Sequence, residues 1–350
     1  MPHLWVRAES RAHEQRVGLT PEGAAHLLAR GFSVTVEESR ARAIPIEGYR
    51  AAGCTIVPEG SWPGAPREAI VFGLKELPED GSPLVHRHIM FGHAFKGQSG
   101  AAAFLQRFRA GGGALLDLEY LVDDTGRRLA AFGYWAGYAG AAVALMAWAA
   151  QQGGGLLGPV SGQGGRDALL ADLRARLAAC GAPRPRCLII GALGRVGTGA
   201  GDLCTALDLP VTRWDMAETA HGGPFPEVLD HEVFLNCILA GPRTPVFVPR
   251  DAPGRSRALG VIGDIACDPT SDFNPVPVYD RATSFDEPVL RVHDAPPLDV
   301  MAIDNLPSML PVESSEDYAA QLLPVLEALA DPASPVWARA RAVFDRHLAH

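Results

Sequence analysis

The sequence has 350 residues, of which 47% are hydrophobic and 20% charged, and its formal net charge is −9. This composition excludes a disordered chain, and the length predicts two domains, because a single hydrophobic core stops growing below this size. There is no run of about 20 apolar residues, which argues against a membrane span, and no basic cluster, which argues against a nucleic-acid partner. The start, Met1-Pro-His-Leu-Trp, lacks the features of a signal peptide, so we expect a cytoplasmic protein.

The first half of the chain alternates predicted strands with predicted helices. A helix is predicted over 20–30, with Thr20 as its N-cap and Pro21 at the first helical position. The alternation predicts an α/β fold with a parallel sheet. The strands of this half are predicted at Leu4–Arg7, Ser33–Glu37, Thr55–Pro58, Ala69–Gly73, Ile89–Gly92 and Ala114–Asp117.

Polar side chains follow two of these strands directly. Lys75 and Glu76 come after the strand at 69–73, and His93 and Lys96 come after the next one. Residues at the carboxyl ends of parallel strands face the ligand crevice of such a fold. A partly desolvated lysine with a lowered pKa and a histidine are both suited to proton transfer near neutral pH. The alternative is a solvated Lys-Glu pair and a structural histidine.

Three arginines are candidates for binding a carboxylate substrate. They are Arg16, close to the predicted first helix, and the pair Arg127 and Arg128. A guanidinium group binds a carboxylate through two parallel hydrogen bonds, which suits a substrate with several carboxylates. The alternative is that these arginines only keep the surface soluble.

The clearest cofactor signal is the run Leu188-Ile-Ile followed by Gly191, Gly194 and Gly197. It predicts a buried strand, a phosphate-binding turn and the start of a helix, although Ala192 stands where the usual pattern has its first glycine. A second strand is predicted at 210–215 and ends at Asp215, about 20 residues past the turn, where a carboxylate accepts hydrogen bonds from a ribose diol. An acidic group there disfavours a 2′-phosphate, so the sequence predicts NAD as the cofactor.

The remaining segments complete this organisation. A helix is predicted over 139–150, and the residues 242–253 are too rich in proline for a helix or a central strand. The tail is predicted to be helical over 314–329 and 337–347. The six cysteines lack CxxC spacing, so we expect reduced thiols and no metal site.

Eight blocks of the chain resemble the NAD-dependent, lysine-forming saccharopine dehydrogenases, which are related to the alanine dehydrogenases. The blocks are Arg7-Ala-Glu-Ser, Glu14-Gln-Arg-Val-Gly-Leu-Thr-Pro, Gly73-Leu-Lys-Glu-Leu-Pro, Phe91-Gly-His-Ala-Phe-Lys-Gly-Gln, Asp117-Leu-Glu-Tyr-Leu, Gly126-Arg-Arg-Leu-Ala-Ala-Phe-Gly, Ile190-Gly-Ala-Leu-Gly-Arg and Ile303-Asp-Asn-Leu-Pro-Ser. With this resemblance we expect two doubly wound, Rossmann-like α/β domains with a cleft between them. The substrate domain is expected to comprise 1–130 and 306–350, and the NAD-binding domain 131–305.

The resemblance implies the reversible oxidative deamination of saccharopine by NAD and water, which gives lysine and 2-oxoglutarate. It implies that His93 is the acid/base of the hydride step and Lys75 that of imine hydrolysis, with Glu76 and Glu119 tuning their basicity. The implied substrate-binding residues are Arg16, Glu76, Lys96, Glu119, Arg127, Arg128 and Phe132. The expected cofactor-binding residues are Gly191, Leu193, Gly194, Arg195, Val196, Gly197, Asp215, Cys237 and Asp304.

Two other functions remain open from the sequence. One is a different amino-acid or opine dehydrogenase, resembling alanine dehydrogenase, that uses the same lysine and histidine. The other is a catalytically silent, NAD-responsive binding protein. In each case the partners are expected to be small molecules, and the chain a monomer or a small homo-oligomer.

Overall fold

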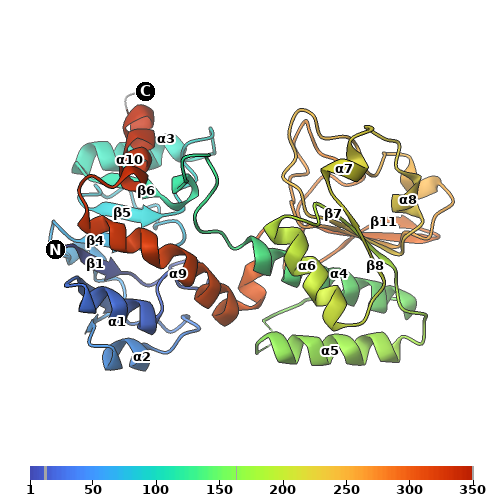
Figure 1. The fold of residues 1–350 in the computed structure, drawn as a ribbon, viewed down its shortest axis with the longest axis horizontal. Coiled ribbons are helices and arrows are strands. Elements are labelled where there is room, and N and C mark those ends of the chain that lie inside the picture. The colour runs from blue at the N-terminus through green and yellow to red at the C-terminus, as the bar shows by residue number, and fades with distance from the viewer. Residues whose placement is uncertain (12–13, 163, 349–350) are drawn as a thin grey trace. The chain divides into compact units, whose positions relative to one another are not determined.

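The computed structural model describes residues 1–11, 14–162 and 164–348 (Figure 1). The chain divides into two compact units, which we call unit 1 (Met1–Ala131 and Pro311–His350) and unit 2 (Phe132–Leu310). The sequence places these boundaries after 130 and before 306. Residues 349 and 350, which the prediction includes in the first domain, lie outside the described residues.

Unit 1 is built on a six-stranded sheet in the order β3-β2-β1-β4-β5-β6, with every pairing parallel. This is the strand order of a doubly wound Rossmann-like sheet, in which the chain reverses its direction of travel beside β1. All six strands overlap the predicted ones. Their bounds are β1 His3–Val6, β2 Ser33–Glu37, β3 Thr55–Val57, β4 Ile70–Phe72, β5 Arg87–Met90 and β6 Ala114–Asp117.

Helices from both ends of the chain cover this sheet. The predicted cap of α1 (Pro21–Ala29) is confirmed, because the Thr20 side chain accepts a hydrogen bond from the Gly23 N–H at 3.2 Å. The tail forms α9 (Pro311–Glu327) and α10 (Pro335–Leu348), as predicted, and α10 packs beside β6 in the same unit (Figure 1). The other helices of unit 1 are α2 Ile46–Ala51 and α3 Ala101–Gly111.

Unit 2 has a second six-stranded sheet, in the order β11-β12-β10-β9-β7-β8. Five strands are parallel, and β11 is an antiparallel edge strand that pairs with β12. The two strands predicted here from the sequence correspond to β7 and β8. The bounds are β7 Cys187–Ile190, β8 Val211–Trp214, β9 Val233–Asn236, β10 Val261–Asp264, β11 Leu290–Asp294 and β12 Pro297–Met301.

The helices of unit 2 differ most from prediction at α4. The sequence places this helix over 139–150, whereas α4 spans Gly133–Gln152 and begins six residues earlier. Glycines at 133, 137 and 140 have low helix propensity, so a reading from propensity alone starts the helix too late. Tertiary packing overrides that propensity. The other helices are α5 Arg166–Ala179, α6 Arg195–Ala206, α7 Met216–Thr219 and α8 Pro226–Leu229.

Two glycines allow α4 and α6 to touch backbone to backbone. A Cβ atom added to Gly137 would overlap the carbonyl oxygen of Val196, and one added to Gly199 would overlap that of Tyr134. The contact is buried, and it fixes the helix that follows the predicted phosphate-binding turn.

In the described part of the chain, no helix combines the length and the apolar character that crossing a membrane requires, and α4 is no exception. All six cysteines are free thiols. No group of three or more histidine, cysteine or acidic side chains is placed to hold a metal ion among the residues described.

Replacing Gly137 with alanine is expected to destabilise the protein, because the added methyl group forces α4 and α6 apart. Overpacking of this kind costs about 1–3 kcal/mol. The matched control is Gly158→Ala, since Gly158 has no neighbouring atom within 4 Å of the new Cβ. Chemical denaturation should show a lower free energy of unfolding for Gly137→Ala alone. Equal stability of the two variants would contradict the packing described here.

Candidate functional site

The carboxyl ends of β4, β5 and β6 carry the predicted chemical residues of unit 1. Lys75 and Glu76 follow β4, His93 and Lys96 follow β5, and Glu119 follows β6. Since these strands are parallel neighbours, their ends meet at one edge of the sheet. The sequence prediction that these residues gather is therefore supported by the topology.

The backbone of Lys75 is held by two residues from the end of β1. The Glu9 carboxylate accepts hydrogen bonds from the backbone N–H groups of Leu74 (2.6 Å) and Lys75 (3.0 Å). Arg7 donates to the Lys75 carbonyl and pairs with Glu9 at 3.2 Å. Arg7 and Glu9 are both almost fully buried, so the position of Lys75 is fixed by a charged pair. The sequence analysis assigns no role to either residue, although both lie in the first motif block.

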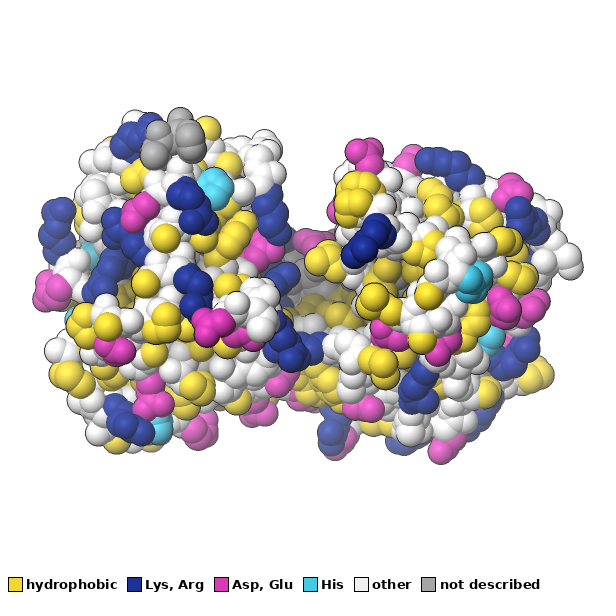
Figure 2. Space-filling model, turned by 45° about the horizontal axis from the view of Figure 1, so that its top comes forward, with side chains coloured by type: hydrophobic (Ala, Val, Ile, Leu, Met, Phe, Trp, Pro, Cys, Tyr) yellow, Lys and Arg dark blue, Asp and Glu magenta, His cyan; other side chains and the backbone are white. Residues whose placement is uncertain are grey.

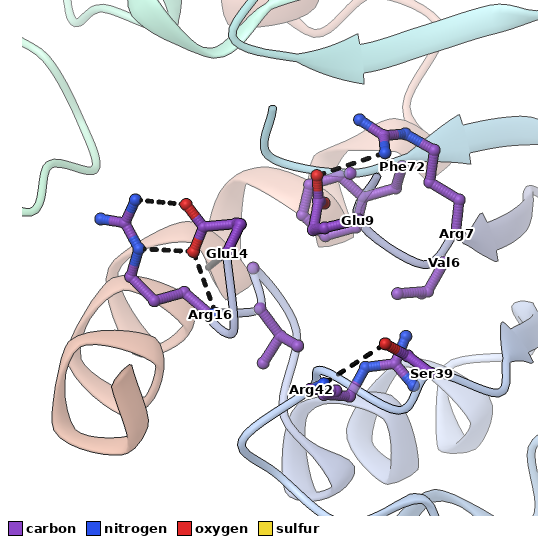
Figure 3. A pocket seen from close by; sticks show the side chains of 11 residues that line it. Val6, Arg7, Glu9, Glu14, Arg16, Ser39, Arg42 and Phe72 are labelled. Atoms are coloured by element: carbon purple, nitrogen blue, oxygen red, sulfur yellow. Dashed lines mark hydrogen bonds and ion pairs between the residues drawn. The ribbon is translucent and has the colours of Figure 1, made fainter. Parts of the chain in front are cut away.

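A second buried pair lies nearby. Arg16 donates two hydrogen bonds to the Glu14 carboxylate, from Nε to Oε1 at 2.8 Å and from Nη2 to Oε2 at 2.6 Å (Figure 3). Both side chains are about 2% exposed or less. The cavity that they line with Arg7, Glu9 and Arg42 measures about 10 Å³, which is room for about one water molecule. Arg16 is thus engaged with Glu14 here, and its role as a substrate ligand stays a prediction.

These charges act on Lys75. Burial lowers the pKa of the Lys75 ammonium, because a low-dielectric environment disfavours its charged form, and the positive charge of Arg16 lowers it further. The Glu14 carboxylate opposes this effect. A lysine whose pKa is lowered holds a larger neutral fraction at a given pH, and only the neutral amine can accept a proton.

His93 projects from the loop after β5 in an uncommon backbone conformation. Its φ of 47° lies in the left-handed region, which few residues other than glycine adopt and which occurs disproportionately at functional sites. Its Nε2 lies 3.7 Å from Glu76 Oε1, and the same Glu76 carboxylate lies 3.6 Å from Arg11. Thus His93 and Glu76, both predicted site residues, are in contact.

A third group joins Lys96, Glu119 and Arg128. Lys96 Nζ donates to Glu119 Oε1 at 2.7 Å, and Arg128 lies 3.7 Å from the same oxygen. Asp117, at the end of β6, links this group to the histidine loop by accepting hydrogen bonds from the N–H groups of Gly92 (3.2 Å) and Glu119 (2.9 Å). Burial raises the pKa of Asp117 to about 6. Asp117, like Arg7 and Glu9, is a positioning residue that the sequence analysis overlooks.

The sequence contains only two lysines, Lys75 and Lys96, beside 29 arginines. Nearly all of the dark-blue side chains in Figure 2 are therefore arginines. Arginine cannot lose its proton in a protein, whereas lysine can. That both lysines follow neighbouring strands at one sheet edge is a strong functional signal, and it is readable from the sequence alone.

Arg127 and Phe132 are the remaining predicted substrate-binding residues. Arg127 is exposed in a turn closed by Asp123, which accepts its backbone N–H at 3.0 Å. Among the described residues, no hydrogen bond or ion pair connects its side chain to Lys75, His93 or Lys96. Phe132 is half-buried at the start of α4 and belongs to unit 2.

The phosphate-binding turn predicted in unit 2 has the expected geometry. Gly191 has a φ of 87°, and a Cβ there would lie 2.7 Å from Ile238 Cγ2. A Cβ on Gly197 would overlap the Gly191 carbonyl oxygen, so the strand and α6 can approach closely only with glycine. At Gly194, the N-cap of α6, a Cβ would meet only the Gly191 carbonyl oxygen at 3.5 Å. The start of α6 is therefore open to a phosphate group.

Asp215 stands at the end of β8 beside this turn. Its Oδ2 accepts the Leu193 N–H at 2.9 Å, and its Oδ1 accepts the Met216 N–H at 2.9 Å. The same carboxylate also accepts the Glu218 N–H in the capping box of α7. An ionised carboxylate has about four acceptor positions, so about one remains for a ribose hydroxyl group. These residues fit an NAD molecule whose pyrophosphate lies at the start of α6.

The corresponding acidic position in unit 1, whose strand order differs from that of unit 2, is already occupied by other partners. The acidic residue at the end of its second strand, Glu37, is buried and accepts hydrogen bonds from Trp5, Ala8, Gly60 and Trp62. Its carboxylate is therefore already saturated.

The other predicted cofactor residues vary in accessibility. Leu193 and Asp304 are exposed, and Arg195 and Val196 are half-buried in the first turn of α6. The Cys237 thiol is buried in the core, where burial raises its pKa, so only its backbone borders the turn: its N–H donates to the Ile190 carbonyl at 2.9 Å.

Comparison with known proteins identifies the family. The model of the alanine dehydrogenase/PNT N-terminal domain matches residues 5–139. L-alanine dehydrogenase has a similar structure, with a TM-score of 0.66 and 19% identity, covering 99% of this chain and 93% of that one. For a transhydrogenase from Sinorhizobium meliloti the TM-score is 0.63 at 15% identity, covering 94% of each chain. These two structures confirm the predicted fold class.

The similarity in sequence is closer and extends over both units. Saccharopine dehydrogenase [NAD(+), L-lysine-forming] from Candida albicans is 44% identical, covering 99% of this chain and 97% of the relative. The enzyme of the same name from Yarrowia lipolytica is 45% identical, with the same two coverages. The chain belongs to the family of the NAD(+)-dependent, L-lysine-forming saccharopine dehydrogenases.

Proposed function

We propose that this protein catalyses the reversible, NAD-dependent oxidative deamination of saccharopine to L-lysine and 2-oxoglutarate. The observation that carries the proposal is the identity of 44–45% with enzymes named for this reaction, over nearly the full length of both partners. The chemistry of the two sites supports it. Unit 2 offers a dinucleotide site, and unit 1 offers acid/base groups and cations for a substrate rich in carboxylates.

Bound NAD supplies the hydride acceptor for the oxidation. Gly194 and the first N–H groups of α6 hold its pyrophosphate, and the Asp215 carboxylate accepts hydrogen bonds from its adenosine ribose. Gly191 and Gly197 keep the turn close to the sheet.

The residues of unit 1 move the protons. Hydride loss from the carbon beside the secondary amine of saccharopine requires that the amine first lose its proton, and His93 accepts it. Neutral Lys75 then takes a proton from the water that attacks the imine carbon and returns it to the nitrogen of the departing lysine. Glu76 and Glu119 tune these groups, and Arg128 binds a carboxylate of the 2-oxoglutarate portion.

The free cysteines are usual for a reducing compartment, and the cytoplasm is the location that we propose.

The direct test follows NADH oxidation by the purified protein with 2-oxoglutarate and lysine. Ornithine with 2-oxoglutarate and pyruvate with ammonia serve as competing substrate pairs. Turnover with lysine and 2-oxoglutarate well above the other pairs is expected. Preference for another pair would mean that the proposed chemistry holds but that the substrate is a different one. Tight NADH binding without turnover would favour a silent binding protein.

Replacing Asp215 with asparagine is expected to weaken the preference for NADH over NADPH. The substitution removes the charge that repels a 2′-phosphate and one strong acceptor for the ribose, and a hydrogen bond to a charged group is worth about 1.5–3 kcal/mol. The ratio of kcat/KM for the two cofactors should fall by at least about tenfold. The control is Asp208→Asn, because Asp208 is exposed and its left-handed conformation (φ 53°) suits asparagine. An unchanged ratio in Asp215→Asn would contradict the ribose contact.

Lys75→Arg keeps a positive charge but cannot release a proton, so kcat is expected to fall at least about 100-fold. In the wild type, kcat/KM for saccharopine should fall with decreasing pH as Lys75 becomes protonated. Because burial and Arg16 lower its pKa, this fall occurs below the pH at which an unperturbed lysine titrates.

The matched control for Lys75→Arg is Lys96→Arg, at the only other lysine of the sequence, which preserves the ion pair with Glu119. A larger loss in the control than in Lys75→Arg would reverse the assignment.

A further inference from the structure

A cavity of about 640 Å³ lies within unit 1, apart from the small cavity around Glu14 and Arg16. Its size falls in the range of ligand pockets, about 300–1,000 Å³. His93 and Glu76 line it on one side. Leu77, Glu79 and Gly81 from the loop after β4, and residues at the start of α3, also line it, and none of these has a role in the account above.

The walls provide an apolar channel. Leu77, Met90 and Phe104 line the cavity, and Leu77 and Met90 are otherwise buried. Burying the methylene groups of an unbranched hydrocarbon chain against such side chains is favourable. The cavity therefore suits a flexible aliphatic stem.

The charged side chains of the cavity walls, other than Glu79, each lie close to a group of opposite charge. Arg11 lies 3.6 Å from Glu76, and Arg107 pairs with Asp80 at 2.8 Å. Within the described part of the chain, no hydrogen bond or ion pair engages the Glu79 carboxylate. Its Oε1 lies 3.9 Å from the place that a Cβ on Gly100 would take, beside the start of α3. Glu79 thus presents a solvent-exposed carboxylate at this wall, next to the N-terminal end of α3.

The loop that carries Glu79 is held in place by a buried arginine. Arg107 is 7% exposed, and it donates to the carbonyl oxygens of Ser82 and Pro78, each at 2.8 Å. Binding to a loop that is already ordered costs little conformational entropy.

We propose that this cavity binds the amino-acid half of the substrate, with Glu79 as the residue that recognises its α-ammonium group. The stem runs along Leu77, Met90 and Phe104, and the distal nitrogen reaches His93. Ser99, next to Gly100 in the wall, provides a hydroxyl donor for the α-carboxylate. This assignment rests on the function proposed above and makes Glu79 a determinant of specificity for lysine among amines.

The test is Glu79→Gln, assayed with lysine, 2-oxoglutarate and NADH. The KM for lysine is expected to rise about 10- to 100-fold, because glutamine keeps an acceptor oxygen but loses the negative charge that strengthens binding of the ammonium group. The kcat and the KM values for 2-oxoglutarate and NADH should stay within about twofold. Inhibition by 6-aminohexanoate, which is lysine without its α-amine, should be unchanged. The control is Glu47→Gln, at an exposed site in α2 that does not line the cavity.

A second variant, Ala103→Phe, fills the cavity from an exposed position of α3 and should also raise the KM for lysine selectively. An unchanged KM for lysine in both variants, with an active wild type, would overturn the assignment while the proposed function stands. Equal losses for lysine, 2-oxoglutarate and NADH would also overturn it, since they indicate a structural defect. A wild type without turnover on lysine would instead overturn the function itself.

Discussion

The parallel sheet of unit 1 is the constraint on which the candidate site depends, because it brings the carboxyl ends of β4, β5 and β6 to one edge. Charged residues at that edge are costly to bury alone, and the structure compensates them in pairs. Arg7 with Glu9 fixes the backbone of Lys75, and Glu14 engages Arg16. The pairs stabilise one arrangement, in which Lys75 is desolvated and flanked by a cation.

The strands of unit 1 and the glycine turn could be predicted because their signals are local. Alternating strands and helices, a Thr-Pro cap and the spacing from Gly191 to Asp215 each reflect backbone requirements that a few neighbouring residues express. The strands β9 to β12 could not be found this way, since irregular, proline-rich segments separate several of them and the local alternation of strand and helix is lost. The early start of α4 also escaped prediction, because its glycines are explained only by contact with α6.

The site residues also divide into those that the sequence shows by local signals and those that only the folded structure explains. Lys75, His93, Lys96 and Glu119 stand out by residue type at strand ends, and the scarcity of lysine marks two of them even more strongly. The supporting residues, such as Glu9 and Asp117, act by accepting backbone hydrogen bonds from segments distant in sequence. No pattern in one sequence reveals such partners. The engagement of Arg16 by Glu14 is likewise a property of the folded edge.

The most direct test of this account is the titration of Lys75 itself. Protein labelled with [ε-13C]lysine contains two labelled side chains, and the Lys96→Arg variant assigns their NMR signals. The account predicts that Lys75 titrates below the value of about 10.4 of an unperturbed lysine, because it is desolvated and lies near Arg16. A midpoint at or above that value would contradict the account, since the lysine would then be held in its charged form.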